Sequence, residues 1–372
     1  MARPSLLSVA WRQPVVAALL TGVGVLTLAT LGVTGPGQTT TALSAMPYLD
    51  MWVRWDAGWY QAIAEHGYTY SPTEQSAAAF FPVYPLLIRG VMAVSGWSVF
   101  VCGVVVTWVM GFLAALTFYA WARWLRGDQP AGRALWLLLL WPFASYLAGA
   151  MYSDATFLLW ATLAFGLLER GRPGWATFFG VLATATRPIA PAVVLGLVAR
   201  SIEIRRVSGQ PLTARDFLPL ASGLGLAAFM AFLGWRFGDP LGFLTTQQGW
   251  NQLSGLDSLL KVKALSKYHG VDLLLPLFHA ALALLCLVLG WRIRRTVGWG
   301  YTVYVWAAVG IPLISSRDFI GLGRYALAAF PVFLELERVA STTRSRWWWV
   351  VALSGALLVW MTVRFTTGRY NA

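Results

Sequence analysis

Long apolar runs, separated by short basic or polar stretches, dominate the pattern of this chain. A helix needs about 20 mainly apolar residues to cross the roughly 30 Å hydrocarbon core of a bilayer. The pattern therefore predicts an all-α polytopic integral membrane protein with about 11 transmembrane helices. The predicted spans lie near residues 14–33, 99–122, 134–150, 153–169, 175–187, 189–200, 217–237, 271–291, 298–314, 322–340 and 347–366.

Two of these runs, 175–187 and 189–200, are too short to cross the hydrocarbon upright at about 1.5 Å per residue. They meet at Arg187-Pro188. Proline has no backbone N–H and disfavours helical conformation in the residue before it. We therefore predict a hairpin of two short helices that is broken at this point.

Two long segments, 34–98 and 238–270, interrupt the apolar runs and are rich in polar and aromatic residues. Pro82 and Pro85 in the first segment predict a bend followed by a helix start. The helix that follows is short and carries Arg89, so we predict a second surface helix there rather than a span.

The stretch 51–68 has helical periodicity. Trp52, Trp55, Trp59 and Ile63 recur at spacings of three and four, which places them on one face of a helix. Tryptophan is typical of the membrane–water interface, where its apolar ring and polar N–H both find partners. The pattern predicts a helix that lies along the membrane surface.

The distribution of charge gives the spans an orientation. The formal net charge is +13, and the arginines concentrate in short loops between spans. Cytoplasmic loops of membrane proteins carry such an excess of Lys and Arg. With the N-terminus inside, the basic loops fall on the inner side, and 34–98 and 238–270 fall on the outer side. Most acidic residues then lie outside, which favours a one-sided active site on the outer face.

Composition excludes other classes of protein. The chain is 58% hydrophobic and 12% charged, whereas soluble domains carry about 25% charged residues. The basic excess sits in loops between spans, so we predict no nucleic-acid partner. The first apolar run is interpreted as an uncleaved span; a signal peptide cleaved near 42–45 is the alternative.

Residues that bind metals are scarce. The chain has two cysteines and three histidines, and they are far apart in the sequence. No spacing typical of a metal site occurs. We predict no metal and no cofactor, so that catalysis, if present, is metal-independent.

Asp56 is the strongest candidate for chemistry in the first outer segment. It lies between Trp55 and Trp59, follows Arg54, and is one helical turn from Tyr60. Partial burial beside a cation tunes a carboxylate for proton abstraction. The alternative is a helix that only anchors the chain at the interface, with a solvated carboxylate.

Five short motifs occur in order along the chain. They are Arg54-Trp55-Asp56 with Phe80-Phe81-Pro82-Val83-Tyr84-Pro85; Tyr152-Ser153-Asp154; Thr186-Arg187-Pro188; Gly238-Asp239-Pro240 with Gln247 and Trp250; and Gly323-Arg324-Tyr325 with Phe330-Pro331. In this order they resemble the PIG-V mannosyltransferases of the GT-C superfamily, which use polyprenyl-phosphate sugars. Asp154 departs from the family pattern, which has glutamate at that position.

The resemblance implies a single transmembrane glycosyltransferase domain over 1–372 with the GT-C-type fold. It implies transfer of a sugar, typically mannose, from a polyprenyl-phosphate donor to an acceptor hydroxyl on the outer face, with inversion. The acceptor is expected to be a glycan or a glycolipid. Members of the superfamily generally use an acidic residue of the first outer loop as base, which here is Asp56.

The leaving group of this reaction is a lipid phosphate, and arginine binds phosphate through two parallel hydrogen bonds. We predict Arg187 as the first phosphate-binding residue, followed by Arg324 and Arg317. The alternative for each is a snorkelling side chain or a structural ion pair with Asp154 or Asp318.

Other predicted substrate contacts come from polar and aromatic residues near the outer face. Several have a structural alternative to substrate binding. Asp154 could cap the N-terminus of the next helix, and Asp239 could form a turn with Pro240. Tryptophans could lie at the membrane interface. Lys261 is expected to face lipid headgroups. The predicted substrate-binding residues are Arg54, Tyr60, Asp154, Asp239, Gln248 and Trp250.

Two other classes of function are the alternatives to a glycosyltransferase. A lipid or sugar transporter or flippase usually shows repeated halves and ionisable groups near the midplane, and neither is visible here. A non-catalytic scaffold of the same fold has no need of Asp56. The expected location is the plasma membrane of a prokaryote rather than an endoplasmic reticulum membrane, with lipids as surrounding partners.

Overall fold

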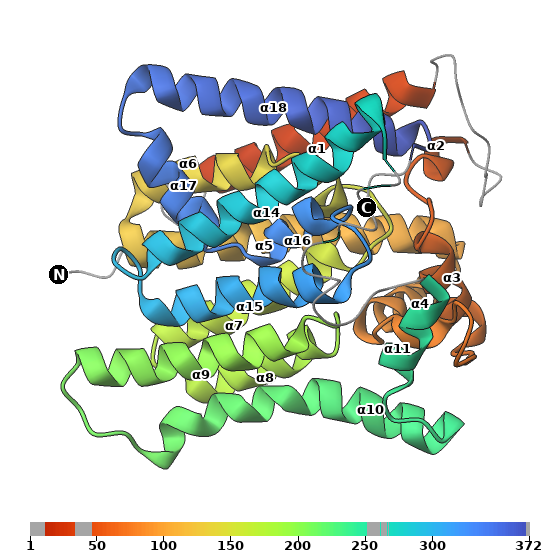
Figure 1. Cartoon of the computed structure of the whole chain (residues 1–372), viewed down its shortest axis with the longest axis horizontal. Helices are drawn as coiled ribbons and strands as arrows, with labels where there is room; N and C mark the ends of the chain where they lie inside the picture. The colour runs from red at the N-terminus through yellow and green to blue at the C-terminus, as the bar shows by residue number, and fades with distance from the viewer. Residues whose placement is uncertain (1–11, 34–46, 251–260, 262–265, 267, 370–372) are drawn as a thin grey trace.

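The computed structural model describes residues 12–33, 47–250, 261, 266 and 268–369, and these contain helices and no strand. The beginning of the first predicted outer segment and much of the second lie outside the described residues. Most of the long helices run side by side across Figure 1. They are α1 (Arg12–Val33), α5 (Val99–Arg126), α6 (Asp128–Leu139), α7 (Asp154–Glu169), α8 (Pro173–Thr184), α9 (Ala190–Val207), α10 (Leu224–Phe237), α14 (Leu274–Ile293), α15 (Trp299–Ser315) and α18 (Arg344–Thr366).

Shorter elements complete the bundle. The helices are α2 (Pro47–Asp50), α3 (Ala57–His66), α4 (Val83–Ser95), α11 (Gly242–Thr245), α16 (Leu322–Ala328) and α17 (Val332–Ala340). The 3₁₀ turns are η2 (Ala77–Ala79), η3 (Ala144–Leu147), η4 (Ala214–Gly223), η5 (Thr246–Trp250) and η6 (Gly270–Leu273). In Figure 1, α3, α4 and α11 gather at the right-hand end of the bundle.

The chain is a helical integral membrane protein. By length and composition alone, four of its described helical segments are long and apolar enough to cross a bilayer: Val99–Arg126, Ala214–Phe237, Leu274–Ile293 and Arg344–Thr366. Several other predicted spans are shorter helices, so the count of about 11 spans stays a prediction. The hairpin predicted around Arg187-Pro188 is confirmed, since α8 ends at Thr184 and α9 begins at Ala190.

Two predicted spans are not continuous helices. The run 134–150 leaves the α-helix after Leu139, because Pro142 has no backbone N–H to continue it. The run 322–340 divides into α16 and α17, with Pro331 at the N-terminal cap of α17. In both runs most residues beyond the break are buried, so hydrophobicity alone did not reveal the irregular backbone.

The helix predicted over 51–68 is shorter than expected. It begins at Ala57 and ends before Gly67, as the glycine predicted, but residues 51–56 form turns. Trp55 has φ of +47°, a left-handed conformation that interrupts a helix. Trp52 is 1% exposed, and it packs into the bundle against Phe365 at 6.4 Å between ring centroids. The predicted stripe therefore does not lie wholly on the membrane surface.

The helix predicted after Pro82 is confirmed as α4, and Arg89 ties it to α3. Its Nε donates to the Ala64 carbonyl at 2.7 Å and its Nη2 donates to the Ile63 carbonyl at 2.9 Å. These carbonyls lie in the last turn of α3, where a helix leaves acceptors unpaired and a cation is favourable. Arg89 therefore fixes the helix that follows Asp56.

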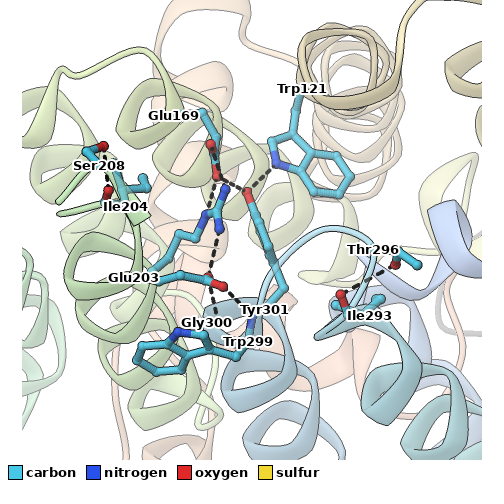
Figure 2. Close-up of polar contacts among 11 residues, drawn as sticks. Trp121, Glu169, Glu203, Ile204, Ser208, Ile293, Thr296, Trp299, Gly300 and Tyr301 are labelled. Atoms are coloured by element: carbon cyan, nitrogen blue, oxygen red, sulfur yellow. Dashed lines mark hydrogen bonds and ion pairs between the residues drawn. The ribbon is translucent and has the colours of Figure 1, made fainter. Parts of the chain in front are cut away.

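Figure 2 shows a buried polar network between α7, α9 and α15. Arg200 donates to Glu169 at 2.6 Å and to Glu203 at 2.7 Å. Glu203 also accepts the backbone N–H of Trp299 at 2.6 Å, so it caps the first turn of α15. Tyr301 completes the network by donating to Glu169 at 2.7 Å.

The helix ends that carry basic loops meet one another. Arg126 at the end of α5 contacts the Thr296 carbonyl just after α14. Arg133 of α6 contacts Glu337 of α17. Together with the Arg200 network, these contacts place the predicted inner loops at one end of the bundle, as the arginine pattern required. The candidate site lies at the other end.

Candidate active site

Five of the predicted site residues line one cavity. It has a volume of about 170 Å³, and its walls come from the start of α3, the turn before α4, the start of α7, the α8–α9 break, η5 and α16. The predicted residues on its walls are Asp56, Tyr60, Arg187, Trp250 and Arg324. They are separated by up to hundreds of positions in the sequence, so the fold alone brings them together.

Asp56 occupies the N-terminal cap position of α3, but its side chain makes no capping hydrogen bond. The carboxylate faces the cavity instead, and Oδ2 lies 3.9 Å from Nη1 of Arg324. Burial raises the pKa of Asp56, opposed mainly by the charge of Arg324. The side chain is still 29% exposed, which leaves the carboxylate open to a ligand. A carboxylate with a raised pKa is a better proton acceptor.

The motif Tyr152-Ser153-Asp154 supports the site through all three of its side chains. The Tyr152 hydroxyl accepts the N–H of Asp56 at 3.3 Å and donates to the carbonyl of Arg54 at 3.2 Å, which holds the turn before α3. Ser153 and Tyr60 share a hydrogen bond of 2.9 Å. Asp154 forms an ion pair with Arg187. One short segment thus fixes the positions of both the candidate base, Asp56, and a cation, Arg187.

Asp154 is the shared partner of two arginines. Besides its ion pair with Arg187, its Oδ1 lies 3.8 Å from Nε of Arg324. Its side chain is only 3% exposed and is not part of the cavity wall. The shorter aspartate therefore still reaches the arginine, and the side chain does not cap α7.

Arg187 and Arg324 keep a face toward the cavity although both are nearly buried. The guanidinium of Arg187 lies 4.9 Å from the centre of the Tyr325 ring, and that of Arg324 lies 5.1 Å from the Tyr152 ring. Aromatic faces attract cations and hold planar guanidinium groups. The arrangement presents two preorganised cations beside Asp56.

An aromatic wall forms part of the same cavity. Trp250 lies 5.9 Å from Trp59 and 6.0 Å from Phe80 between ring centroids, and Phe80 stacks on Trp59 at 5.8 Å. Tyr60 contacts Phe80 edge to face at 5.2 Å. Burial raises the pKa of Tyr60 to about 12, so its hydroxyl stays protonated and can donate. Rings beside polar groups are typical of sites that bind amphipathic ligands.

Besides Asp154, three predicted substrate contacts are not on this cavity. Gln248 is exposed, and its neighbour Gln247 lines the wall instead, because adjacent side chains in a 3₁₀ turn point about 120° apart. Asp239 accepts from Tyr70, from Thr245 at 3.0 Å and from the Leu241 N–H at 2.9 Å. It closes a turn, which was its alternative interpretation.

Arg54 is the third residue that does not reach the cavity. Its Nη2 donates to the carbonyl of Thr366 at 3.1 Å, at the end of α18. The left-handed turn at Trp55 separates its direction from that of Asp56. The cation beside Asp56 is therefore Arg324 and not Arg54, its neighbour in the sequence.

Arg317 lines an adjoining cavity of about 440 Å³ that shares Asp56 and Trp250 with the first. It is 44% exposed and lies 3.5 Å from Asp318. Lys261 is also near, since its Nζ donates to the Ser316 hydroxyl at 3.1 Å and it is fully buried. Burial lowers the pKa of Lys261 to about 8. The expectation that Lys261 faces headgroups is therefore wrong.

His279 was not singled out by the sequence, yet it positions Arg324. Its Nδ1 accepts the N–H of Gly321 at 3.2 Å and that of Gly323 at 3.1 Å. Because both donors are backbone groups, this nitrogen must carry a lone pair. At Gly323 an added Cβ would lie 2.3 Å from the Phe143 ring. The beginning of α16, which carries Arg324, is thus tied to α14.

Replacing His279 by leucine and by asparagine separates hydrogen bonding from packing. Asparagine can place Oδ1 where Nδ1 lies, whereas leucine has a similar shape without an acceptor. Leucine leaves two buried N–H groups unpaired, so we expect it to lower the free energy of unfolding by about 1–3 kcal/mol. Asparagine should recover much of this loss in thermal unfolding in detergent. Equal losses in both variants would contradict the capping role.

Comparison with known proteins gives a family match over part of the chain. The profile of the Mannosyltransferase (PIG-V) family matches residues 32–201. A stretch of 144 residues is 33% identical to GPI alpha-1,6-mannosyltransferase 2 of Cricetulus griseus, covering 36% of this chain and 28% of that protein. Asp56, Asp154 and Arg187 lie inside the range 32–201 matched by the family profile, whereas Trp250 and Arg324 lie beyond it.

Two solved structures share the fold at low sequence identity. The oligosaccharyltransferase of Archaeoglobus fulgidus, in complex with Zn and sulfate, is 12% identical with a TM-score of 0.52 over 95% of this chain and 53% of that chain. ArnT of Cupriavidus metallidurans, bound to undecaprenyl phosphate, is 14% identical with a TM-score of 0.51 over 95% and 76%. Residues 32–201 thus match the PIG-V mannosyltransferase family, as the motifs predicted, and the chain has a GT-C-type fold.

Proposed function

We propose that this chain is an inverting glycosyltransferase that moves a sugar from a polyprenyl-phosphate donor to an acceptor hydroxyl. The observation that carries the proposal is the cavity in which the uncapped carboxylate of Asp56 faces the cations of Arg187 and Arg324. Mannose is the proposed sugar because the matching family is one of mannosyltransferases. A polyprenyl phosphate is the proposed carrier because ArnT, which shares the fold, was solved with undecaprenyl phosphate.

The proposed chemistry needs one base. As the acceptor oxygen bonds to the anomeric carbon, its proton passes to Asp56, and the bond from that carbon to the phosphate oxygen breaks. Attack from the face opposite the leaving group inverts the configuration. General-base assistance of this kind is worth about 10²- to 10⁴-fold in rate.

The arginines are proposed to stabilise the leaving group. The donor is a phosphodiester with one negative charge, and the lipid phosphate that leaves carries a second. Fixed cations stabilise charge that develops in a transition state. When Asp56 accepts the proton it loses its own charge, so Arg324 is left with Asp154 as its charged partner and more of its charge acts on the phosphate.

The aromatic wall is proposed to hold the sugar and the acceptor. Trp250, Phe80 and Tyr60 line the same cavity as the cations, and Gln247 adds an amide that can bond hydroxyl groups. The adjoining cavity lined by Arg317 gives a second path to Asp56. We propose that donor and acceptor approach through these two openings.

The proposed orientation places this cavity outside. The basic loops lie at the opposite end of the bundle, and such loops stay in the cytoplasm. A prokaryotic plasma membrane remains the predicted location; the similar proteins named above come from a mammal, an archaeon and a bacterium.

Purified protein, supplied with polyprenyl-phosphate mannose and a panel of glycan and glycolipid acceptors, is expected to release polyprenyl phosphate and form a mannosylated product. Because two arginines supply the positive charge, we expect the rate to be unchanged in a chelator. Mass spectrometry of the product and of the released lipid measures both. Activity that is lost in chelator and restored by Mg²⁺ or Mn²⁺ would refute metal independence. Movement of intact donor across vesicles without transfer would favour the transporter.

A further inference from the structure

A strongly basic pocket lies at the end of the bundle opposite the candidate active site. It has a volume of about 290 Å³ and is lined by Trp291, Arg292, Arg294, Arg295, Thr296 and Arg338. These residues belong to the end of α14, the turn after it, and the end of α17. Along α14, Arg292 lies about 20 Å from His279 at 1.5 Å per residue, so this pocket is separate from the cavity around Asp56.

The pocket holds more cations than its carboxylate can balance. Glu335 is fully buried and is the described acid at its base. It accepts from Arg292 at 3.0 Å, from Arg338 at 2.7 Å and from Thr296 at 3.0 Å. Four arginines against one carboxylate leave an excess of three positive charges. Arg133 and Arg205 at the same end each pair with a single acid, Glu337 and Asp216.

Three of the four cations, Arg292, Arg294 and Arg338, are held in place by contacts within the protein. The guanidinium of Arg294 lies 3.8 Å from the centre of the Trp291 ring. Trp291 stacks on Trp306 at 5.5 Å with an interplanar angle of 25°, and Trp306 Nε1 donates to the Leu287 carbonyl at 3.0 Å. Glu335 fixes Arg292 and Arg338 through ion pairs. Preorganised groups lose little conformational freedom when they bind an anion.

An exposed apolar stripe leads along α14 to the pocket. Leu284 is 62% exposed, Val288 is 50% exposed and Trp291 is 49% exposed. These residues are spaced by four and three, so they share one helix face, and Trp306 of α15 adds an exposed ring beside it. The stripe belongs to a helix long and apolar enough to cross the bilayer. It offers a surface for acyl chains directly next to the cations.

We propose that this pocket binds the phosphate headgroup of an anionic phospholipid, whose acyl chains lie along the Leu284–Val288–Trp291 stripe. The charge excess selects a negative headgroup, and basic pockets between membrane helices suit such headgroups. The stripe distinguishes a lipid from a free phosphate, which has no use for it. The site does not depend on the proposed sugar transfer.

The test is a titration of delipidated protein in detergent, followed by native mass spectrometry. Phosphatidylglycerol is expected to bind about tenfold or more tighter than phosphatidylcholine or glycerol phosphate. In the double variant Arg294→Gln/Arg295→Gln, its affinity is expected to fall about tenfold or more. Arg295→Gln alone, an exposed position, should give a smaller loss in the same direction.

The matched control is Arg344→Gln/Arg346→Gln at the start of α18. It removes the same charge from exposed positions on the same end of the bundle, and phosphatidylglycerol affinity should be nearly unchanged. An equal loss in the control would show diffuse attraction and overturn the site. If phosphatidylcholine binds as tightly as phosphatidylglycerol, the charge of the headgroup does not determine binding and the proposal is wrong. Glycerol phosphate that binds as tightly as the lipid would make this a free-anion site.

Discussion

Replacing Asp56 by asparagine is expected to lower the turnover number of sugar transfer by about 10²- to 10⁴-fold while donor lipid still binds. Asparagine keeps the size of the side chain but cannot accept the acceptor's proton. Asp56 makes no capping hydrogen bond, so its loss should leave α3 in place. Transfer assays and donor-binding titrations on the same preparation measure the two effects.

The matched control is Glu65→Gln on the same helix. Glu65 is exposed and is not on the cavity wall, so this variant should transfer sugar at the normal rate. If Asp56→Asn keeps near-normal turnover, Asp56 is not the base. If it also loses donor binding, the carboxylate serves the structure of the cavity rather than proton transfer.

The pH dependence of kcat/KM is a second test of Asp56 as the general base. A general base works only when deprotonated, so kcat/KM should fall as the pH drops through the pKa of Asp56. Burial raises this pKa above the usual range of aspartate, so the fall should begin at a higher pH than an exposed aspartate would give. The asparagine variant should lack this limb of the profile.

Replacing Arg187 by glutamine is expected to weaken binding of the lipid-phosphate donor by about 10- to 100-fold, because one charge-assisted hydrogen bond is worth about 1.5–3 kcal/mol. Acceptor binding should change much less. Arg317→Gln is the comparison, since Arg317 is half-exposed and lines the adjoining cavity. Its loss should weaken donor binding less.

Arg187 also neutralises Asp154, and a second variant separates the two roles. In Asp154→Asn/Arg187→Gln both partners of the ion pair are removed, and Arg324 keeps Asp56 as a carboxylate partner. This avoids an uncompensated charge worth about 3–5 kcal/mol. The double variant should regain thermal stability but not donor affinity. Recovery of donor affinity in it would mean that Arg187 acts only as the partner of Asp154.

Interactions between near neighbours in the chain were predictable. Gly67 ends α3, Pro82 begins α4, and the hairpin breaks at Arg187-Pro188, because glycine and proline limit the local backbone in ways that do not depend on the rest of the fold. The order of the motifs predicted the family match over 32–201.

Predictions that depended on a continuous helix were less accurate. The spacing of Trp52 and Trp55 suggested one surface face, but the left-handed turn at Trp55 sends Trp52 into the bundle. The same turn carries Arg54 away from Asp56. Gln247 lines the cavity whereas Gln248, the next residue, is exposed, so an error of one position selects the wrong amide. Side-chain direction over a few residues follows backbone dihedrals that composition does not reveal.

By itself, then, the sequence determined that this is a helical membrane protein with its basic loops at one end, and it singled out Asp56 and Arg187 as candidate site residues. Only the tertiary structure decided that Asp154 joins Arg187 to Arg324, that Arg324 rather than Arg54 faces Asp56, and that His279 holds the start of α16. The reason is physical: hydropathy and turn chemistry act between near neighbours, whereas these contacts join residues that only the packing of the whole bundle brings together.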